Sequence, residues 1–346
     1  MTDKLRENCL VIQQKFPYLN LNCDADTKTL QEYYFRFTGY KEYDEYNNEY
    51  GNYDEYKEFH PEYLGEYIDI EKYRINFIDI NHMELLYKRD EWDNQIYRYQ
   101  DKYVKILKIL DNNHEDYYLN YDKYVEMRRE IIISKFLHKH FPHNIINIQG
   151  FFEFDDINDN HYFAIVSSEI NGQPFNIWLE TTDLQTLKLY ILRLFRFLVL
   201  LNRKYKFTHY DLHTGNFLVG MNIDGVYPIL IDFGRTYIEF DLKWAEKNKI
   251  SPILGGYNED INVWHHTFLI YDFVLALLKI YNKTNISPKL LKKYGDIRSQ
   301  NIIDIHNYVK KLLKFVEIDT TNFSITDLGF DSFDPNIIIS YIEDSL

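Results

Sequence analysis

The sequence predicts an α+β fold, in which an antiparallel sheet with one helix precedes a mainly helical half. The chain has 346 residues, enough for two domains or one large two-lobed unit, because single domains usually span about 100 to 200 residues. Apolar residues alternate in short runs between residues 73 and 110, which is typical of half-buried strands. From Leu184 onward long helical patterns dominate, so sheet and helices are segregated along the chain.

Residues 1–72 form a distinct acidic segment that is rich in tyrosine. Residues 40–72 contain eleven Asp or Glu against three Lys, in a chain whose formal charge is -14. Such a composition predicts an acidic extension or a small helical annex, with a module that binds a partner as the alternative. The acidity argues against a nucleic-acid partner, because an acidic surface repels polyanions.

The cysteines and the apolar stretches bear on the compartment. Cys9 and Cys23 are too few for a disulfide framework or a zinc site and suit a reducing compartment, although one bridge between them stays open. The amino terminus lacks the pattern of a secretory signal. The most apolar stretches, 190–201 and 267–278, are too short to cross a bilayer. We therefore expect a cytoplasmic protein with no membrane partner.

The expected sheet and its helix lie in the first half of the fold. Three alternating runs from residue 73 onward (YRINFIDI, QIYRY and KYVKILKIL) predict antiparallel strands. Residues 122–140 then switch to helical spacing. Two further strands are predicted at INIQGFFEF and HYFAIVSSEI.

The second half is expected to be helical except around two polar motifs. A turn-rich stretch at 208–220 and a short strand at 228–233 interrupt the helical patterns. Because the polar motifs lie between the two halves, we expect a ligand cleft at that junction.

The strongest functional signal is HYDLHTGNFLV at 209–219, followed by LIDFGR at 230–235. Asp211 and Asn216 lie on a loop, and Asp232 begins an Asp-Phe-Gly turn after a short strand. One carboxylate and one amide oxygen suit Mg²⁺, and a second carboxylate can take the proton from an attacking hydroxyl. These residue types in this order predict Mg²⁺-dependent phosphoryl transfer.

The two motifs resemble those of the eukaryotic-type protein kinase family. The form Asp-Leu-His-x-Gly-Asn is also similar to haspin-type and atypical kinases and to small-molecule phosphotransferases of the same fold. The abundance of Asn, Ile, Lys and Tyr resembles that of divergent viral-type kinases. The resemblance implies a protein-kinase-like bilobal fold, with an N-lobe at 73–170 and a C-lobe with a helical tail at 171–346. It also implies ATP and Mg²⁺ as cofactors and Ser or Thr of a protein as the substrate.

By this resemblance the motif residues acquire roles. Asp211 is the catalytic base, while Asn216 and Asp232 hold Mg²⁺. His213 stands where protein kinases usually have a Lys that contacts the transferred phosphate; a neutral imidazole there donates one hydrogen bond without a full charge. Asp272, or less favourably Asp260, is expected to be the buried carboxylate that braces the catalytic loop.

The resemblance extends to a helix that carries a glutamate for a lysine partner. Glu130 is the expected partner, and Glu126, one turn earlier on the same helix face, is the second candidate. The lysine lies in KYVKILKIL, where two positions fit.

The choice between these lysines depends on strand alternation. Lys108 would share its face with Ile106, so that an apolar residue covers the adenine. Lys105 would instead put Tyr103 in the adenine position. Lys108 is the preferred choice.

The glycine-rich nucleotide loop of the family has no counterpart in this sequence. Asp79, Asn81 and Glu84 stand where its glycines are expected, and two of these side chains repel phosphate. Residues expected to contact the nucleotide, besides the two lysines, are Ile78, Leu86, Ile106, Ser168, Glu169 and Ile170. The missing glycines keep a catalytically weak pseudokinase scaffold open as an alternative to an enzyme.

The activation region also departs from the family pattern. Tyr210 replaces the Arg that normally precedes the catalytic Asp, so control by phosphorylation of an activation segment is not expected. No Ala-Pro-Glu follows the Asp-Phe-Gly turn. This departure favours the alternative of a small-molecule phosphotransferase, while the Glu130 helix favours a protein kinase.

Overall fold

The structure is a computed structural model, and its chain forms two compact units. One unit comprises residues 1–72 and 239–254, and the other comprises residues 73–238 and 255–346. The described residues are 6–7, 9–10, 13–14, 22–25, 68–89, 94–110, 117–157, 160–255, 269–285, 296–316 and 334–346. Most of the acidic segment and Asp260 therefore lie outside the described residues.

The described part of the first unit includes a disulfide and the short helix α6. Cys9 and Cys23 are joined, with their Cα atoms 5.4 Å apart, so the bridge that the sequence leaves open is present. Helix α6 (Leu242–Asn248) begins where the Asp241 side chain accepts a hydrogen bond from the backbone N–H of Trp244. The compartment stays a prediction.

The short elements near the unit boundaries are η3 (Glu71–Tyr73), β9 (Ile238–Glu239) and β10 (Ile253–Leu254). Within the described ranges, every helix is too short or too polar to span a bilayer.

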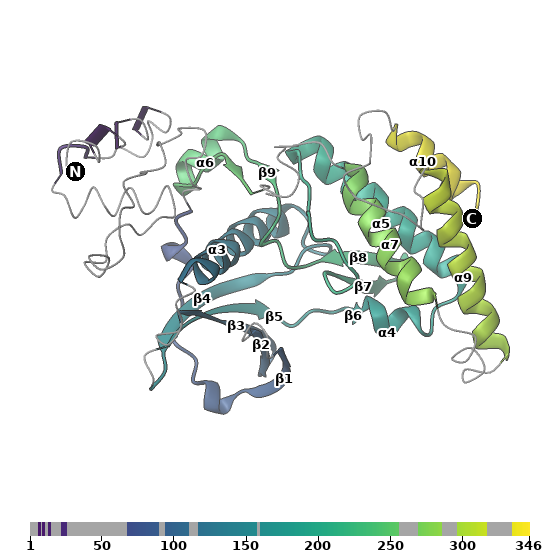
Figure 1. The fold of residues 1–346 in the computed structure, drawn as a ribbon, viewed down its shortest axis with the longest axis horizontal. Coiled ribbons are helices and arrows are strands. Elements are labelled where there is room, and N and C mark those ends of the chain that lie inside the picture. Colours follow the sequence, from purple (N-terminus) through teal and green to yellow (C-terminus); the bar gives the residue numbers. More distant parts are fainter. Residues whose placement is uncertain are drawn as a thin grey trace, which may run out of the picture. The chain divides into compact units, whose positions relative to one another are not determined.

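The second unit contains a five-stranded antiparallel sheet with strand order β1-β2-β3-β5-β4 (Figure 1). The sheet and the segregated helices confirm the predicted α+β class. Its strands are β1 (Glu84–Arg89), β2 (Asn94–Tyr99), β3 (Lys102–Leu110), β4 (Ile148–Asp155) and β5 (His161–Ser168).

The two faces of this sheet have different covers. Helix α3 (Tyr117–His140) lies on one face, where the Tyr124 ring contacts the Phe163 ring at 5.5 Å between centroids. On the other face, Val104 and Ile106 belong to an apolar cluster that packs against Ile75, Ile78, Ile80 and Met83. Since successive side chains alternate along a strand, each β3 side chain faces either helix α3 or the apolar cluster on the opposite face.

The strand predicted at YRINFIDI is wrong. Residues 75–79 have no strand structure and lead into η4 (Ile80–His82), while the first strand begins at Glu84. The alternating apolar residues of this segment pack flat on the outer sheet face instead of pairing with a neighbour along their length. Alternation therefore correctly indicated half-burial here, but it did not indicate a strand hydrogen-bond ladder.

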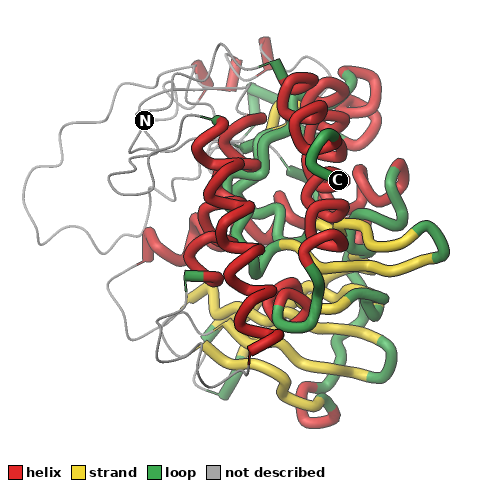
Figure 2. Tube along the Cα trace, turned by 90° about the vertical axis from the view of Figure 1, so that its right-hand side faces the viewer, coloured by secondary structure: helices red, strands yellow, loops and turns green. Residues whose placement is uncertain are grey.

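The rest of the second unit is mainly helical, and Figure 2 shows these helices beside the strands. A three-stranded sheet with order β6-β7-β8 lies in the part that the sequence assigns to turns and one short strand. The elements are β6 (Gln173–Pro174), α4 (Phe175–Leu179), α5 (Leu184–Tyr205), β7 (Phe217–Asn222), β8 (Gly225–Leu230), α7 (Leu269–Thr284), α9 (Asp296–Phe315) and α10 (Pro335–Glu343). The division into lobes at residue 170 stays a prediction.

Candidate active site

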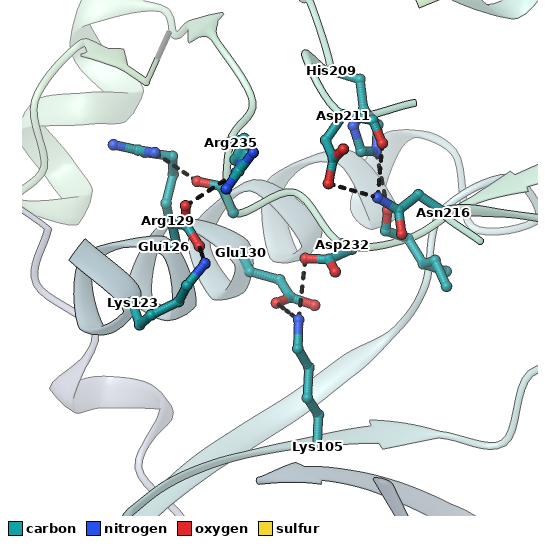
Figure 3. Close-up of polar contacts among 12 residues, drawn as sticks. Lys105, Lys123, Glu126, Arg129, Glu130, His209, Asp211, Asn216, Asp232 and Arg235 are labelled. Atoms are coloured by element: carbon teal, nitrogen blue, oxygen red, sulfur yellow. Dashed lines mark hydrogen bonds and ion pairs between the residues drawn. The ribbon is translucent and has the colours of Figure 1, made fainter. Parts of the chain in front are cut away.

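A lysine on β3 joins two carboxylates that come from distant parts of the second unit (Figure 3). The Nζ atom of Lys105 lies 2.8 Å from Oε2 of Glu130 on α3. The same atom lies 3.1 Å from Oδ1 of Asp232, two residues after β8. One cation between two carboxylates leaves one net negative charge, which can attract a divalent cation.

Burial and charge act against each other in this trio. Burial lowers the pKa of Lys105, but the charges of Asp232 and Glu130 outweigh burial. The pKa therefore lies above its ordinary value, and the lysine stays charged. Burial likewise opposes the Asp232 charge, but Lys105 outweighs it and holds the pKa of Asp232 below its ordinary value. For the more deeply buried Glu130, desolvation prevails and raises its pKa. Asp232 is therefore the carboxylate that best keeps its charge for a cation.

The preference for Lys108 is wrong, because the strand register places it on the other face. Lys105 pairs with Ile165 of β5, and Lys108 pairs with Tyr162. The face that Lys105 shares with α3 also carries Tyr103, which pairs with Ser167. Of the two arrangements that the sequence left open, the structure thus has the one with Tyr103 beside the lysine.

Three residues predicted to contact the nucleotide lie on the sheet face opposite Lys105. Ile106 is buried in the outer cluster together with Ile78. Ser168 pairs with Lys102, and its Oγ accepts hydrogen bonds from the side chains of Asn147 and Gln149. Ile78, Ile106 and Ser168 are therefore structural residues of the outer sheet face.

The other predicted nucleotide contacts are only partly available. The backbone N–H of Glu169 donates to the Asp101 carbonyl at 2.8 Å, and its side chain pairs with Arg98 at 3.0 Å. The Ile170 carbonyl accepts from Gly172 at 2.8 Å. Leu86 on β1 is 46% exposed. The hydrogen bonds that an adenine edge would use at Glu169 are thus partly occupied.

The catalytic-loop motif forms a compact polar cluster. The Asn216 Nδ2 donates to the Asp211 backbone carbonyl at 2.7 Å and to Asp211 Oδ2 at 3.1 Å. Its nitrogen is committed to Asp211, so its oxygen is the atom left for a metal. The His213 Nδ1 accepts from the Gly215 N–H at 3.0 Å, which places the proton of a neutral ring on Nε2, 3.8 Å from Asp211 Oδ2.

Asp272 on α7 braces the start of this loop, as the sequence predicts. Its two oxygens accept the backbone N–H groups of His209 at 2.6 Å and of Tyr210 at 3.0 Å. Burial raises the pKa of Asp272 to about 7, although the two N–H donors lower it. Tyr210 has a φ of 60°, a conformation that costs energy for a non-glycine residue and persists only where its surroundings hold it.

Side chains of helix α3 also contact the Asp-Phe-Gly turn. They bind the backbone carbonyl of its glycine and the side chain of the residue that follows it. The Arg129 Nη1 donates to the Gly234 carbonyl at 2.6 Å. The Arg235 Nε donates to Glu126 Oε1 at 3.3 Å. A Cβ at Gly234 would lie 3.0 Å from the Glu126 Cβ, so glycine permits this close approach.

Sequence reasoning gave Arg129 and Arg235 no role. Arg235 ends the LIDFGR motif, and Arg129 precedes the predicted ion-pair glutamate by one position. The available signal was helix spacing, because residues 126, 129 and 130 lie within one turn and face a common neighbour.

A cavity of about 360 Å³ opens beside these groups, a volume within the usual range for small-ligand sites. Four predicted catalytic residues, Asp211, His213, Glu130 and Asp232, line it together with the lysine that replaces Lys108. The lining residues are Lys105, Leu107, Lys123, Glu126, Met127, Glu130, Asp211, His213, Asp232, Gly234 and Arg235.

Two oxygen donors beside the cavity fit the requirements of Mg²⁺. In the part of the chain that the structure describes, no group of three or more His, Cys, Asp or Glu is arranged to hold a metal ion. Mg²⁺ commonly takes one or two protein oxygens and completes its shell with water and phosphate oxygens. The charged Asp232 carboxylate and the Asn216 amide oxygen fit that pattern.

Comparisons with known proteins give no family assignment. No family model matches the chain, and no curated protein matches it. A co-crystal structure of WbdD with the kinase inhibitor LY294002 is similar at a TM-score of 0.37 and 14% identity, covering 67% of this chain and 47% of that chain. A crystal structure of monomeric WbdD is similar at a TM-score of 0.35 and 15% identity, covering 63% and 44%. The match thus spans less than half of either WbdD chain.

Proposed function

We propose that this protein is an ATP-dependent phosphotransferase with a protein-kinase-like fold. The observation that carries the proposal is the contact of Lys105 with both Glu130 and Asp232, beside the Asp211 and Asn216 pair. A lysine held by a helix glutamate, a metal-binding carboxylate and a base carboxylate are the parts that phosphoryl transfer requires.

Each side chain has a separate task in this proposal. Lys105 binds phosphate oxygens of ATP, and Glu130 holds its side chain in place. Asp232 and the Asn216 oxygen hold Mg²⁺, which when bound supplies positive charge against the charge of the transferred group. Asp211 accepts the proton of the acceptor hydroxyl. His213, whose Nε2 lies 3.8 Å from Asp211 Oδ2, donates one hydrogen bond to the transferred phosphate in this proposal.

We further propose that the acceptor is a Ser or Thr hydroxyl of a protein. The ion pair of Glu130, on a long helix that covers the sheet, supports this choice over a small-molecule acceptor. The form of the catalytic loop, Asp-Leu-His-x-Gly-Asn, supports the second candidate, a small-molecule phosphotransferase. Incubating the full chain with radiolabelled ATP and either peptide pools or metabolite pools separates the two, because label then enters only one class of acceptor.

Replacing the base tests the reaction itself. In the Asp211→Asn variant we expect transfer to fall about a thousandfold, within the range for loss of a general base. Thermal stabilisation by Mg-ATP should persist in this variant. The matched control is Asp224→Asn, which removes an exposed carboxylate at the β7–β8 turn. Undiminished turnover by Asp211→Asn would overturn the assignment.

A further inference from the structure

The cavity lining also holds two basic side chains, Lys123 and Arg235, that do not belong to the proposed metal site. Lys105, Glu130 and Asp232 carry one net negative charge among them. On the other side of the lining, Lys123 Nζ lies 2.8 Å from Glu126 Oε2, and Arg235 Nε lies 3.3 Å from Glu126 Oε1. Both cations therefore contact the Glu126 carboxylate, at the side of the cavity lining away from Lys105.

Arg235 is well placed to meet a second ligand. Its contact with Glu126 uses the Nε edge, and no hydrogen bond of its terminal nitrogens occurs among the described residues. Its side chain is 59% exposed and lines the same cavity as Asp211. Burial lowers the pKa of Arg235, but the charges of Glu126, Asp211 and Asp232 outweigh burial and raise it, as expected for a guanidinium close to these three carboxylates.

The position of these charges points to the acceptor and not to ATP. Lys105 and the proposed Mg²⁺ ligands already provide for the phosphates of ATP. The basic pair instead lies where α3 meets the residue after the Asp-Phe-Gly turn, and His213 and Asp211 border the same space. In a chain of net charge -14, an anionic substrate would otherwise be repelled, so a local positive site has a selective use.

We propose that Arg235 and Lys123 form a recognition site for an acceptor that carries a carboxylate or phosphate near its reactive hydroxyl. This inference rests on the proposed phosphotransferase activity and names the chemical class of its acceptor. Arg235 can bind such a group through two parallel N–H donors, which suits a planar carboxylate or a phosphate. Lys123 adds a point charge from the neighbouring helix turn.

The test compares Ser peptides of equal length that carry either acidic or neutral residues around the Ser, with Mg-ATP and the full chain. We expect the acidic peptide to have the higher kcat/KM. Arg235→Gln should lower the selectivity for the acidic peptide about tenfold, mainly through KM, as for one charge-assisted hydrogen bond at a partly exposed site. Arg235→Lys should recover part of it, because charge is kept while the paired donors are lost.

A second pair of variants controls for general charge. Lys123→Gln should lower the acidic selectivity, while Lys139→Gln, on the exposed end of the same helix, should not. Equal loss in both variants, or an Arg235→Gln effect confined to the KM of ATP, would overturn the inference.

Binding without turnover keeps the two proposals apart. Fluorescence anisotropy of the labelled acidic peptide, with a non-hydrolysable ATP analogue and Mg²⁺, should show a Kd that rises in Arg235→Gln. If the protein binds no Mg-ATP and transfers no phosphate, the phosphotransferase proposal fails. If it transfers phosphate but binds acidic and neutral peptides alike, only the recognition site fails.

Discussion

The catalytic loop and strand β1 are built in opposite ways. His209, Asn216 and Asp272 are almost fully buried, and each makes hydrogen bonds that fix the loop. In β1, which is an edge strand, Leu85 and Tyr87 are each 50% exposed. A buried polar network tolerates little change, because each lost partner leaves an unsatisfied group. The exposed strand lacks that constraint, and Asp79, Asn81 and Glu84, which stand where the kinase resemblance leads one to expect glycines, lie before or at its start.

Among the changes outside the base itself, the largest effect is expected from loss of Lys105, which joins strand β3 to Asp232. In Lys105→Met, Glu130 loses its cation inside the protein, and we expect about 3 kcal/mol lower stability and at least about a hundredfold slower transfer. Denaturant unfolding and initial rates measure the two effects.

The matched control for that change is Lys108→Met, which alters the opposite face of the same strand. It should cost less than about 1 kcal/mol and keep most of the activity. Similar losses in both variants would contradict the assignment of Lys105.

Replacing Asp272, which holds the catalytic loop through two backbone N–H groups, should have the second-largest effect. Asp272→Ala leaves the N–H groups of His209 and Tyr210 without their acceptor, but it also removes a carboxylate whose burial is unfavourable. We expect a net loss of about 2 kcal/mol and a rate at least about tenfold lower. Asp272→Asn keeps one acceptor oxygen and should lie between wild type and Ala; an Asn variant worse than Ala would contradict this account.

Loss of the hydrogen bond between Arg129 of α3 and the Asp-Phe-Gly turn should have a smaller effect. Arg129→Met removes the 2.6 Å hydrogen bond to the Gly234 carbonyl, so Asp232 is held less firmly. We expect about tenfold lower kcat, with a higher Mg²⁺ requirement, for a charged hydrogen bond of this kind. Arg128→Met, one position earlier on the helix, is the control and should leave the Mg²⁺ requirement as in wild type.

Stability should also depend on pH through Asp272. Its pKa is raised from the ordinary value to about 7 in the folded protein, so the folded state binds the extra proton between about pH 4 and 7. The contribution of this group to stability is therefore greatest below pH 4 and is lost as the pH rises to 7. Unfolding curves should show wild type losing stability relative to Asp272→Asn over this window; parallel pH profiles would argue against it.

The smallest effect is expected from a change in the exposed strand β1. Glu84 begins β1, is exposed, and pairs with Arg98 of β2. Glu84→Gln removes one negative charge near the expected path of the phosphates, so the KM for ATP should fall about twofold with stability unchanged, as for an exposed charge. An unchanged or higher KM would show that β1 does not cover the nucleotide.

The residues of the buried region were easier to predict from the sequence than those of the sheet face. Asp211, Asn216 and Asp232 come together because the chemistry requires their types at a fixed spacing, and Asp272 could be identified by its apolar neighbours. The lysine could not be chosen, because alternation permits two registers and only the cover on each face decides between them. Arg235 and Arg129 were missed because their partners are backbone and helix atoms far away in the sequence.

The contact between Lys105 and Asp232 joins residues 127 positions apart, and this separation matters while the chain is being made. A ribosome that adds about 5 to 20 residues per second needs on the order of ten seconds to pass from the lysine to the aspartate. The brace at Asp272 emerges later still. Until then β3 and α3 can place Glu130 beside Lys105, but the centre that would bind a metal and transfer phosphate cannot exist on the nascent chain.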